Sequence, residues 1–185
     1  MKIIIVEGAT CTGKTAVIKR AMIALQNKGL KVKHVEWPEN FGRFTVKQYV
    51  DKSISAACDF DAQTIKLKKS FDVVICDSHP IITNFVKYPD WVNPSRLWQT
   101  LTKPHAVLLL NCQPNIIKQR AAAKDKLISL NDIVCQLDGY ADLSAAQVGT
   151  MHIHRTNVSD NLGLLLASGD LVRIVESFFN QGEMK

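Results

Sequence analysis

Short, mainly apolar runs alternate with longer amphipathic segments along the chain, and this alternation is its strongest structural signal. Strands are expected at residues 2–6, 31–35, 71–76, 105–111 and 151–154. Runs that are apolar at every position indicate strands buried on both faces, as in a parallel sheet covered by helices. No internal repeat or Pro/Gly/Ser-rich linker interrupts the pattern. We therefore predict a single domain over residues 1–185, with an α/β fold of three layers around a five-stranded parallel sheet.

The segments between these strands carry helical patterns and helix-boundary residues. Helices are expected at about residues 14–27, 45–69, 94–102, 114–123, 129–147 and from the fifth strand to residue 179, with one or two helical turns between Pro80 and Pro89. The segment 45–69 is predicted as two helices that break near Cys58-Asp59. Ser129 to Asp132 resembles a capping box. In such a fold, ligands bind at the carboxyl ends of the strands.

A glycine-rich loop follows the first strand at that edge. Its sequence fits the pattern GxxxxGK[ST], and it precedes a predicted helix, which is the context that this phosphate-binding motif requires. The glycines let backbone N–H groups turn toward phosphate oxygens, and the helix start adds a positive dipole end. Lys14 can reach the β- and γ-phosphates, and the Thr15 hydroxyl can bind Mg²⁺. We therefore predict ATP and Mg²⁺ as cofactors. The expected ATP-binding residues are Gly8, Ala9, Thr10, Cys11, Thr12, Gly13, Lys14 and Thr15.

A carboxylate is expected to assist the magnesium ion. Asp77 ends the apolar third strand, Phe71 to Cys76, as the aspartate of a Walker B segment does. The metal-binding residues are therefore predicted to be Thr15 and Asp77. In an alternative interpretation Asp77 only caps the next turn, and another carboxylate such as Glu36 assists the metal.

Charge and composition narrow the partners. Lys and Arg number 23 against 17 Asp and Glu, a net charge of +6 that helps to attract anionic substrates. Nucleic acid is not the expected partner, because no dense basic run is interleaved with aromatics. No apolar run approaches the roughly 20 residues that cross a bilayer, and residues 1–7 are too short an apolar stretch for a signal peptide. We therefore expect a cytoplasmic protein without a membrane partner. Of the five cysteines, Cys11 alone lies in the loop, as a small residue or a redox-sensitive thiol.

Five segments together resemble the thymidylate kinase branch of the nucleotide and deoxynucleoside kinases. They are Val6-Glu7-Gly8 with the loop, Glu36-Trp37-Pro38-Glu39, residues 56–63, Val74 to Asp77, and Leu109 to Pro114 with Arg120 six residues later. The likeness spans nearly the whole chain. It implies transfer of the ATP γ-phosphoryl group to a nucleoside monophosphate or a deoxynucleoside, and it allows a homodimer. An NKxD motif, usual in guanine-binding switches, does not follow the fourth strand, which ends Asn111-Cys112-Gln113.

The resemblance also implies roles for individual residues. The catalytic set is predicted to be Lys14, Asp77, Arg120 and Lys124, with Arg120 at the base of a short lid at about residues 121–129. Lys124 and Lys126 stand in the lid, where the family usually has arginines. The predicted substrate-binding residues are Glu36, Trp37, Glu39, Arg43, Phe60 and His79. Glu36 or Glu39 is expected to hold a sugar hydroxyl or to act as a base, and Phe60 to stack on the base.

The chain departs from the family pattern at the acceptor site. Ser78 replaces the arginine of the Asp-Arg pair, and Phe60 stands where the central helix normally supplies a phosphate-binding arginine. Ala9 to Thr12 carry no charge. These departures keep two alternatives open. One is a kinase with another hydroxyl acceptor, such as a nucleic-acid 5′-hydroxyl, and the other is a non-catalytic nucleotide-binding module.

Overall fold

The computed structural model describes residues 1–36, 45–150 and 152–180. Its centre is a five-stranded, all-parallel sheet with the strand order β2-β3-β1-β4-β5. The strands are β1 (Lys2–Glu7), β2 (Val32–Glu36), β3 (Val73–Asp77), β4 (Ala106–Asn111) and β5 (Ile153–Asn157). The predicted α/β fold with a parallel sheet is confirmed, and this strand order is consistent with the P-loop NTPase-like folds.

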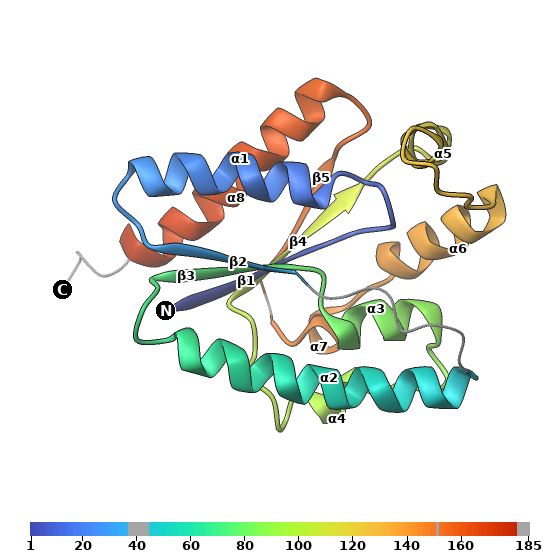
Figure 1. Ribbon diagram of the computed structural model, residues 1–185, viewed down its shortest axis with the longest axis horizontal. Coiled ribbons are helices and arrows are strands. Elements are labelled where there is room, and N and C mark those ends of the chain that lie inside the picture. Colours follow the sequence, from blue (N-terminus) through green and yellow to red (C-terminus); the bar gives the residue numbers. More distant parts are fainter. Residues whose placement is uncertain (37–44, 151, 181–185) are drawn as a thin grey trace.

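Helices cover both faces of the sheet and complete the three layers (Figure 1). They are α1 (Lys14–Asn27), α2 (Val46–Leu67), α3 (Pro80–Lys87), α4 (Pro94–Leu97), α5 (Pro114–Ala122), α6 (Leu130–Ala141), α7 (Ala145–Val148) and α8 (Asn161–Asn180). α1 and α8 pack side by side on one face, whereas α2, α3, α4 and α7 lie on the other. The central strands are buried on both faces, as their wholly apolar sequences require.

The register of the sheet brings polar residues from three strands to one edge. Val6 is paired with Asp77, and Asp77 is paired with Glu36 on its other side. The carboxyl ends of β1, β2 and β3 therefore lie next to one another. The loop of residues 8–13 leaves this edge and enters α1, so the edge predicted for ligand binding carries the glycine-rich loop.

Two helix predictions are wrong. The segment expected as two helices over 45–69 is one helix, α2 (Val46–Leu67), with no break at Cys58-Asp59. Neither of those residues prevents helical geometry, and the neighbouring Ala57 and Phe60 are buried on its inner face, which keeps it continuous. Thr45 and Gln48 form a capping box at its start.

The predicted helix 129–147 is instead divided into α6 and α7. Ser129 caps α6 by accepting a hydrogen bond from the Asp132 amide, as expected. The chain then leaves the helix, Leu143 is buried in the core, and Ser144 with Gln147 begins α7 through a second capping box. A strong local cap thus restarts a helix that periodicity alone would have continued.

Smaller differences concern boundaries. The helix expected at 94–102 is only the four-residue α4, and the fifth strand extends further than predicted, to Asn157. A single helix, α8, closes the described part of the chain. Within the described ranges, no helix has both the length and the apolar character needed to cross a membrane.

Candidate functional site

The loop between β1 and α1 is closely packed at its two glycines. Gly8 has φ 150° and Gly13 has φ 108°, values that side-chain-bearing residues rarely adopt. A Cβ on Gly8 would lie 2.7 Å from the Leu110 carbonyl oxygen, and one on Gly13 would lie 2.6 Å from Leu164 Cδ2. Both positions therefore require glycine, for the backbone turn and for the close approach of β4 and α8.

Residues far away in the sequence hold the loop in place. The Thr10 amide donates to Gln136 Oε1 of α6 at 3.1 Å. Arg120 of α5 donates to the Thr12 carbonyl at 2.9 Å and to the Val158 carbonyl at 2.8 Å. The loop shape is thus fixed by α5, α6 and the segment after β5.

Lys14 begins α1 and lies beneath the loop, with only 8% of its surface exposed. Its ammonium group donates to the carbonyl oxygens of Gly8 at 2.8 Å and Ala9 at 3.3 Å. The charge is therefore held at the loop by uncharged carbonyl acceptors, which an anion can replace.

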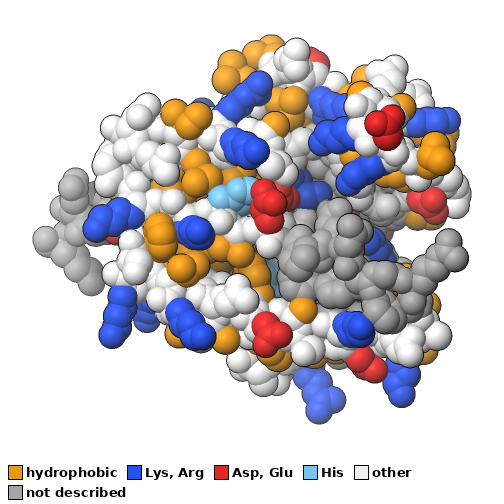
Figure 2. Space-filling view, viewed as in Figure 1, with side chains coloured by type: hydrophobic (Ala, Val, Ile, Leu, Met, Phe, Trp, Pro, Cys, Tyr) orange, Lys and Arg blue, Asp and Glu red, His pale blue; other side chains and the backbone are white. Residues whose placement is uncertain are grey.

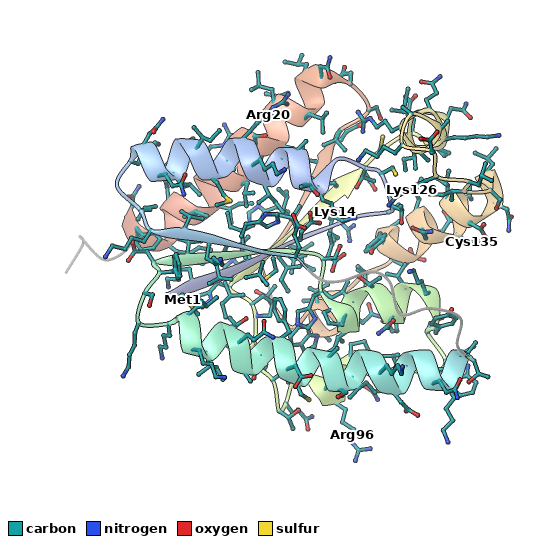
Figure 3. All side chains as sticks on the ribbon, in the orientation of Figure 1. Met1, Lys14, Arg20, Arg96, Lys126 and Cys135 are labelled. Carbon is teal, nitrogen blue, oxygen red and sulfur yellow. The ribbon has the colours of Figure 1, made fainter. Side chains whose placement is uncertain are left out.

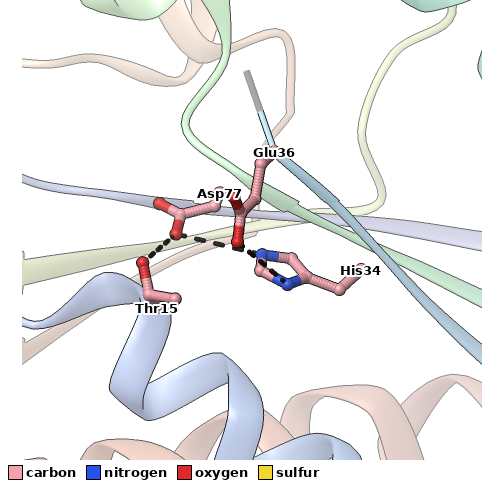
Figure 4. Close-up of polar contacts among 4 residues, drawn as sticks. All are labelled: Thr15, His34, Glu36 and Asp77. Carbon is pink, nitrogen blue, oxygen red and sulfur yellow. Dashed lines mark hydrogen bonds and ion pairs between the residues drawn. The ribbon is translucent and has the colours of Figure 1, made fainter. Parts of the chain in front are cut away.

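Thr15 and Asp77 meet at the same edge. The Thr15 hydroxyl donates to Asp77 Oδ2 at 2.5 Å (Figure 4). Asp77 does not cap the following helix, as the alternative interpretation required. The N-cap of α3 is His79, whose side chain accepts a hydrogen bond from the Ile81 amide. Asp77 instead faces α1 and the loop.

A cavity of about 300 Å³ opens over these groups. It is lined by Thr10, Cys11, Gly13, Lys14, Thr15, Ala16, Glu36, Asp77, Lys124 and Lys126. Figure 2 shows basic side chains gathered on the α5–α6 side of this face. Lys14 and Lys126, which both line the cavity, are labelled in Figure 3. The structure thus brings five of the eight predicted ATP-binding residues around one cavity, together with Asp77, Glu36 and the two lysines of the segment after α5. Gly8, Ala9 and Thr12 are not part of its lining.

The predicted acceptor residues Phe60 and His79 lie in the core instead of lining this cavity. Phe60 is 7% exposed and His79 is 5% exposed. Their rings meet edge to face with centroids 5.3 Å apart, and His79 also packs against Trp98 at 4.9 Å. Burial lowers the pKa of His79 to about 3, so the ring is neutral. A binding role for either residue stays a prediction that would require this aromatic cluster to open.

The remaining predicted site residues divide into two groups. Trp37, Glu39 and Arg43 lie outside the described residues. Arg120 is described, and its guanidinium is engaged by backbone carbonyls next to the loop. Its predicted role at the lid base stays a prediction, and what the structure adds is a structural contact with the loop.

Sequence reasoning missed a buried carboxyl at the base of the loop. Glu7 is fully buried; Oε1 accepts from the His79 amide at 2.5 Å, and Oε2 accepts from the Tyr140 hydroxyl at 3.1 Å. Burial raises the pKa of Glu7 to about 7, although Lys14 opposes that rise. The sequence did contain a signal for this site, because Glu7 is a charged residue directly after the apolar run Ile3 to Val6.

His34 of β2 was also missed. Its Nδ1 lies 3.6 Å from Glu36 Oε1, and its Nε2 lies 3.9 Å from Asp77 Oδ2 (Figure 4). The available signal was spacing, since His34 precedes Glu36 by two residues and side chains two apart share a face of a strand.

No model of a known protein family matches this chain, and a search of curated protein sequences finds no significant relative.

Proposed function

We propose that this protein is an ATP-dependent phosphotransferase that acts on a nucleoside monophosphate, as thymidylate kinases do, or on a deoxynucleoside. The observation that carries the proposal is the convergence of Lys14, Thr15 and Asp77 on one cavity at the carboxyl edge of a parallel sheet. Phosphoryl transfer needs mainly positioning and charge neutralisation, and these groups supply both.

The donor half of the site follows from the loop. Lys14 would exchange its bonds to the Gly8 and Ala9 carbonyls for phosphate oxygens, with a gain in charge-assisted bonding. Lys124 and Lys126 face the same cavity and would add positive charge around the transferred group. As lysines, they would act as point charges without the paired donors of arginine.

A magnesium ion fits the oxygen groups that are present. The Thr15 hydroxyl and the Asp77 carboxylate are hard oxygen ligands of the kind that Mg²⁺ prefers, and they already touch. When bound, the ion would neutralise charge on the phosphates. The protein itself would contribute by holding Thr15, in the first turn of α1, next to Asp77, at the end of β3.

The acceptor half favours a neutral hydroxyl over a monophosphate. Glu36 lines the cavity at the end of β2, and its side chain is 63% exposed. A carboxylate there can accept a hydroxyl proton but would repel a phosphate. Ser78 and Phe60, at the positions where the resemblance leads us to expect arginine, are both buried. A deoxynucleoside is therefore the acceptor that we favour.

A panel assay tests the proposal. Purified protein, ATP and Mg²⁺ are incubated with each nucleoside, deoxynucleoside and monophosphate in turn, and ADP is measured. We expect ADP formation with one class of acceptor, and its loss in Lys14→Ala. Glu36→Gln should lower kcat more than it raises KM if Glu36 acts as the base.

Two results would replace the proposal. Stimulation of ADP formation only by oligonucleotides with a 5′-hydroxyl would assign another hydroxyl acceptor. If no acceptor works while ATP still binds and Lys14→Ala abolishes that binding, the protein is a non-catalytic nucleotide-binding module.

A further inference from the structure

Three side chains of the sheet edge face α1 together because of strand geometry. His34 and Glu36 are two residues apart on β2 and so share one face of that strand. Asp77 is the register partner of Glu36 on β3, so its side chain points to the same face. One ligand atom from each of the three lies within 4.8 Å of the others. The Thr15 hydroxyl on α1 donates a hydrogen bond to the Asp77 carboxylate.

The imidazole of His34 has an incomplete set of partners. Only 13% of its side chain is exposed, and its Nε2 atom is buried without a hydrogen-bond partner. Buried ring nitrogens are normally bonded, so such an atom calls for an explanation. Nε2 faces Asp77 Oδ2 across 3.9 Å, a separation too long for a direct hydrogen bond. A metal ion placed between Nε2 and Asp77 Oδ2 would be bound by both atoms at this separation.

We propose that His34, Glu36 and Asp77 form a mixed nitrogen–oxygen site for a divalent transition-metal ion, which the chain binds in preference to Mg²⁺ and without nucleotide. Thr15 is placed to add a fourth ligand.

The distances agree with such a site. Metal–ligand bonds of about 2.1 Å place neighbouring ligand atoms about 3.0 Å apart in an octahedron and opposite ones about 4.2 Å apart. The 3.9 Å between His34 Nε2 and Asp77 Oδ2 lies between these values. Glu36 Oε1 is 3.6 Å from the other ring nitrogen, Nδ1, so the Glu36 carboxylate has to turn toward the Nε2 side to bind the same ion. Small rotamer adjustments of Glu36, which is mostly exposed, bring its oxygen to the ion.

The nitrogen ligand from His34 is the reason why the site should prefer a transition-metal ion to Mg²⁺. Mg²⁺ takes oxygen ligands and gives up its water reluctantly. An imidazole nitrogen suits Co²⁺, Ni²⁺ and Zn²⁺, and affinity for these ions exceeds that for earlier divalent metals at the same ligands. A site built from the oxygen ligands of Thr15 and Asp77 alone would discriminate less between these ions and Mg²⁺.

The test measures metal binding by the nucleotide-free chain of residues 1–185. Co²⁺ is titrated by visible absorption and by calorimetry, and Mg²⁺ by calorimetry and by competition. We expect Co²⁺ to bind at least about tenfold more tightly than Mg²⁺. His34→Phe, which keeps a ring of similar size, should weaken Co²⁺ binding by about 10–100-fold.

Controls separate this site from other metal-binding groups. His154→Phe changes another strand histidine that lies near an acidic residue, Asp170, and should bind Co²⁺ like the native chain. Cys11→Ser removes the thiol that lines the same cavity and should also keep Co²⁺ binding. Glu36→Gln, a mostly exposed position, should weaken binding without unfolding the protein.

A variant could lose metal binding because it misfolds, so a further measurement uses the native chain. Paramagnetic Co²⁺ should shift the ring signals of His34 in NMR spectra and leave those of His154 in place. Equal Co²⁺ affinity in His34→Phe and the native chain, loss of binding in Cys11→Ser, or unshifted His34 signals would each overturn the proposal. The inference is independent of phosphoryl transfer: metal binding without ADP formation would leave it standing while the proposed function failed.

Discussion

The two sides of the β3 carboxyl end use their polar groups differently. Toward α1, Lys14, Thr15 and Asp77 face a cavity, and their present partners are ones that a ligand can replace. Toward α2 and α4, His79 lies between Phe60 and Trp98, and the three rings fill the space. One side is therefore an open cavity lined by charged and polar groups, whereas the other is closed by aromatic packing.

The difference supports placing the proposed function on the α1 side. A binding site needs charged groups whose partners can be exchanged for a ligand. The side toward α1, which we call the donor side, has such groups, and we call the other the aromatic side. The aromatic side has a neutral histidine and buried rings, which contribute stability. Changes on the donor side should therefore affect binding and catalysis, and changes on the aromatic side should affect folding. The following predictions test this division, from the largest expected effect to the smallest.

The largest effect is expected on the aromatic side. Phe60→Ala should lower the free energy of unfolding by about 3–5 kcal/mol, because it leaves a cavity against His79. Denaturant unfolding measures this loss, and calorimetry should show unchanged ATP affinity of the folded protein. Phe60→Leu is the milder control. A variant that keeps its stability but raises the acceptor KM would show that Phe60 contacts substrate and that the division is wrong.

On the donor side, Lys14→Ala should lower kcat/KM for phosphoryl transfer by roughly 10²–10³-fold, the usual effect of removing one charge-stabilising donor. Its unfolding free energy should change much less than that of Phe60→Ala. Lys19→Ala, an exposed position on the same helix, is the control and should retain activity. Equal losses in the two variants would contradict a specific role for Lys14.

Glu7 lies between the two sides and should make stability depend on pH. Its pKa is about 7 in the folded chain and 4.5 as a model value, so the folded state holds the proton more tightly. The stabilisation is complete below pH 4.5 and is lost as pH rises toward 7, by about 3 kcal/mol at most.

Glu7→Gln mimics the protonated carboxyl and should remove this loss. We expect the variant to be more stable than the native chain at pH 8 and nearly equal to it at pH 4.5, as measured by urea unfolding at both values. Because His79 is present in both proteins, its own acid sensitivity cancels in the difference. A constant difference across this range would contradict the raised pKa.

The smallest effect is expected at Arg120, which joins the loop to the segment after β5. Arg120→Gln should lower the unfolding free energy by about 1.5–3 kcal/mol, because it removes charge-assisted bonds to the Thr12 and Val158 carbonyls. Arg20→Gln, at an exposed position on α1, is the control. A fall in kcat with unchanged stability would instead support the lid role that the resemblance implies.

The sequence determined the sheet and the loop by itself. Wholly apolar strand segments can be stable only when both faces are covered, and a glycine-rich loop between such a strand and a helix has one practical geometry. Asp77 followed from its position at the end of β3. Local signals suffice where one short segment carries the whole physical requirement.

Only the tertiary structure decided which other groups meet the loop. The hydrogen bond that the Thr10 amide donates to Gln136, the burial of Glu7 and the approach of His34 to Asp77 join residues from separate elements. Their positions depend on strand order, register and helix packing, which no local pattern encodes. The same dependence explains Phe60 and His79, whose residue types suit a substrate site but whose neighbours place them in the core.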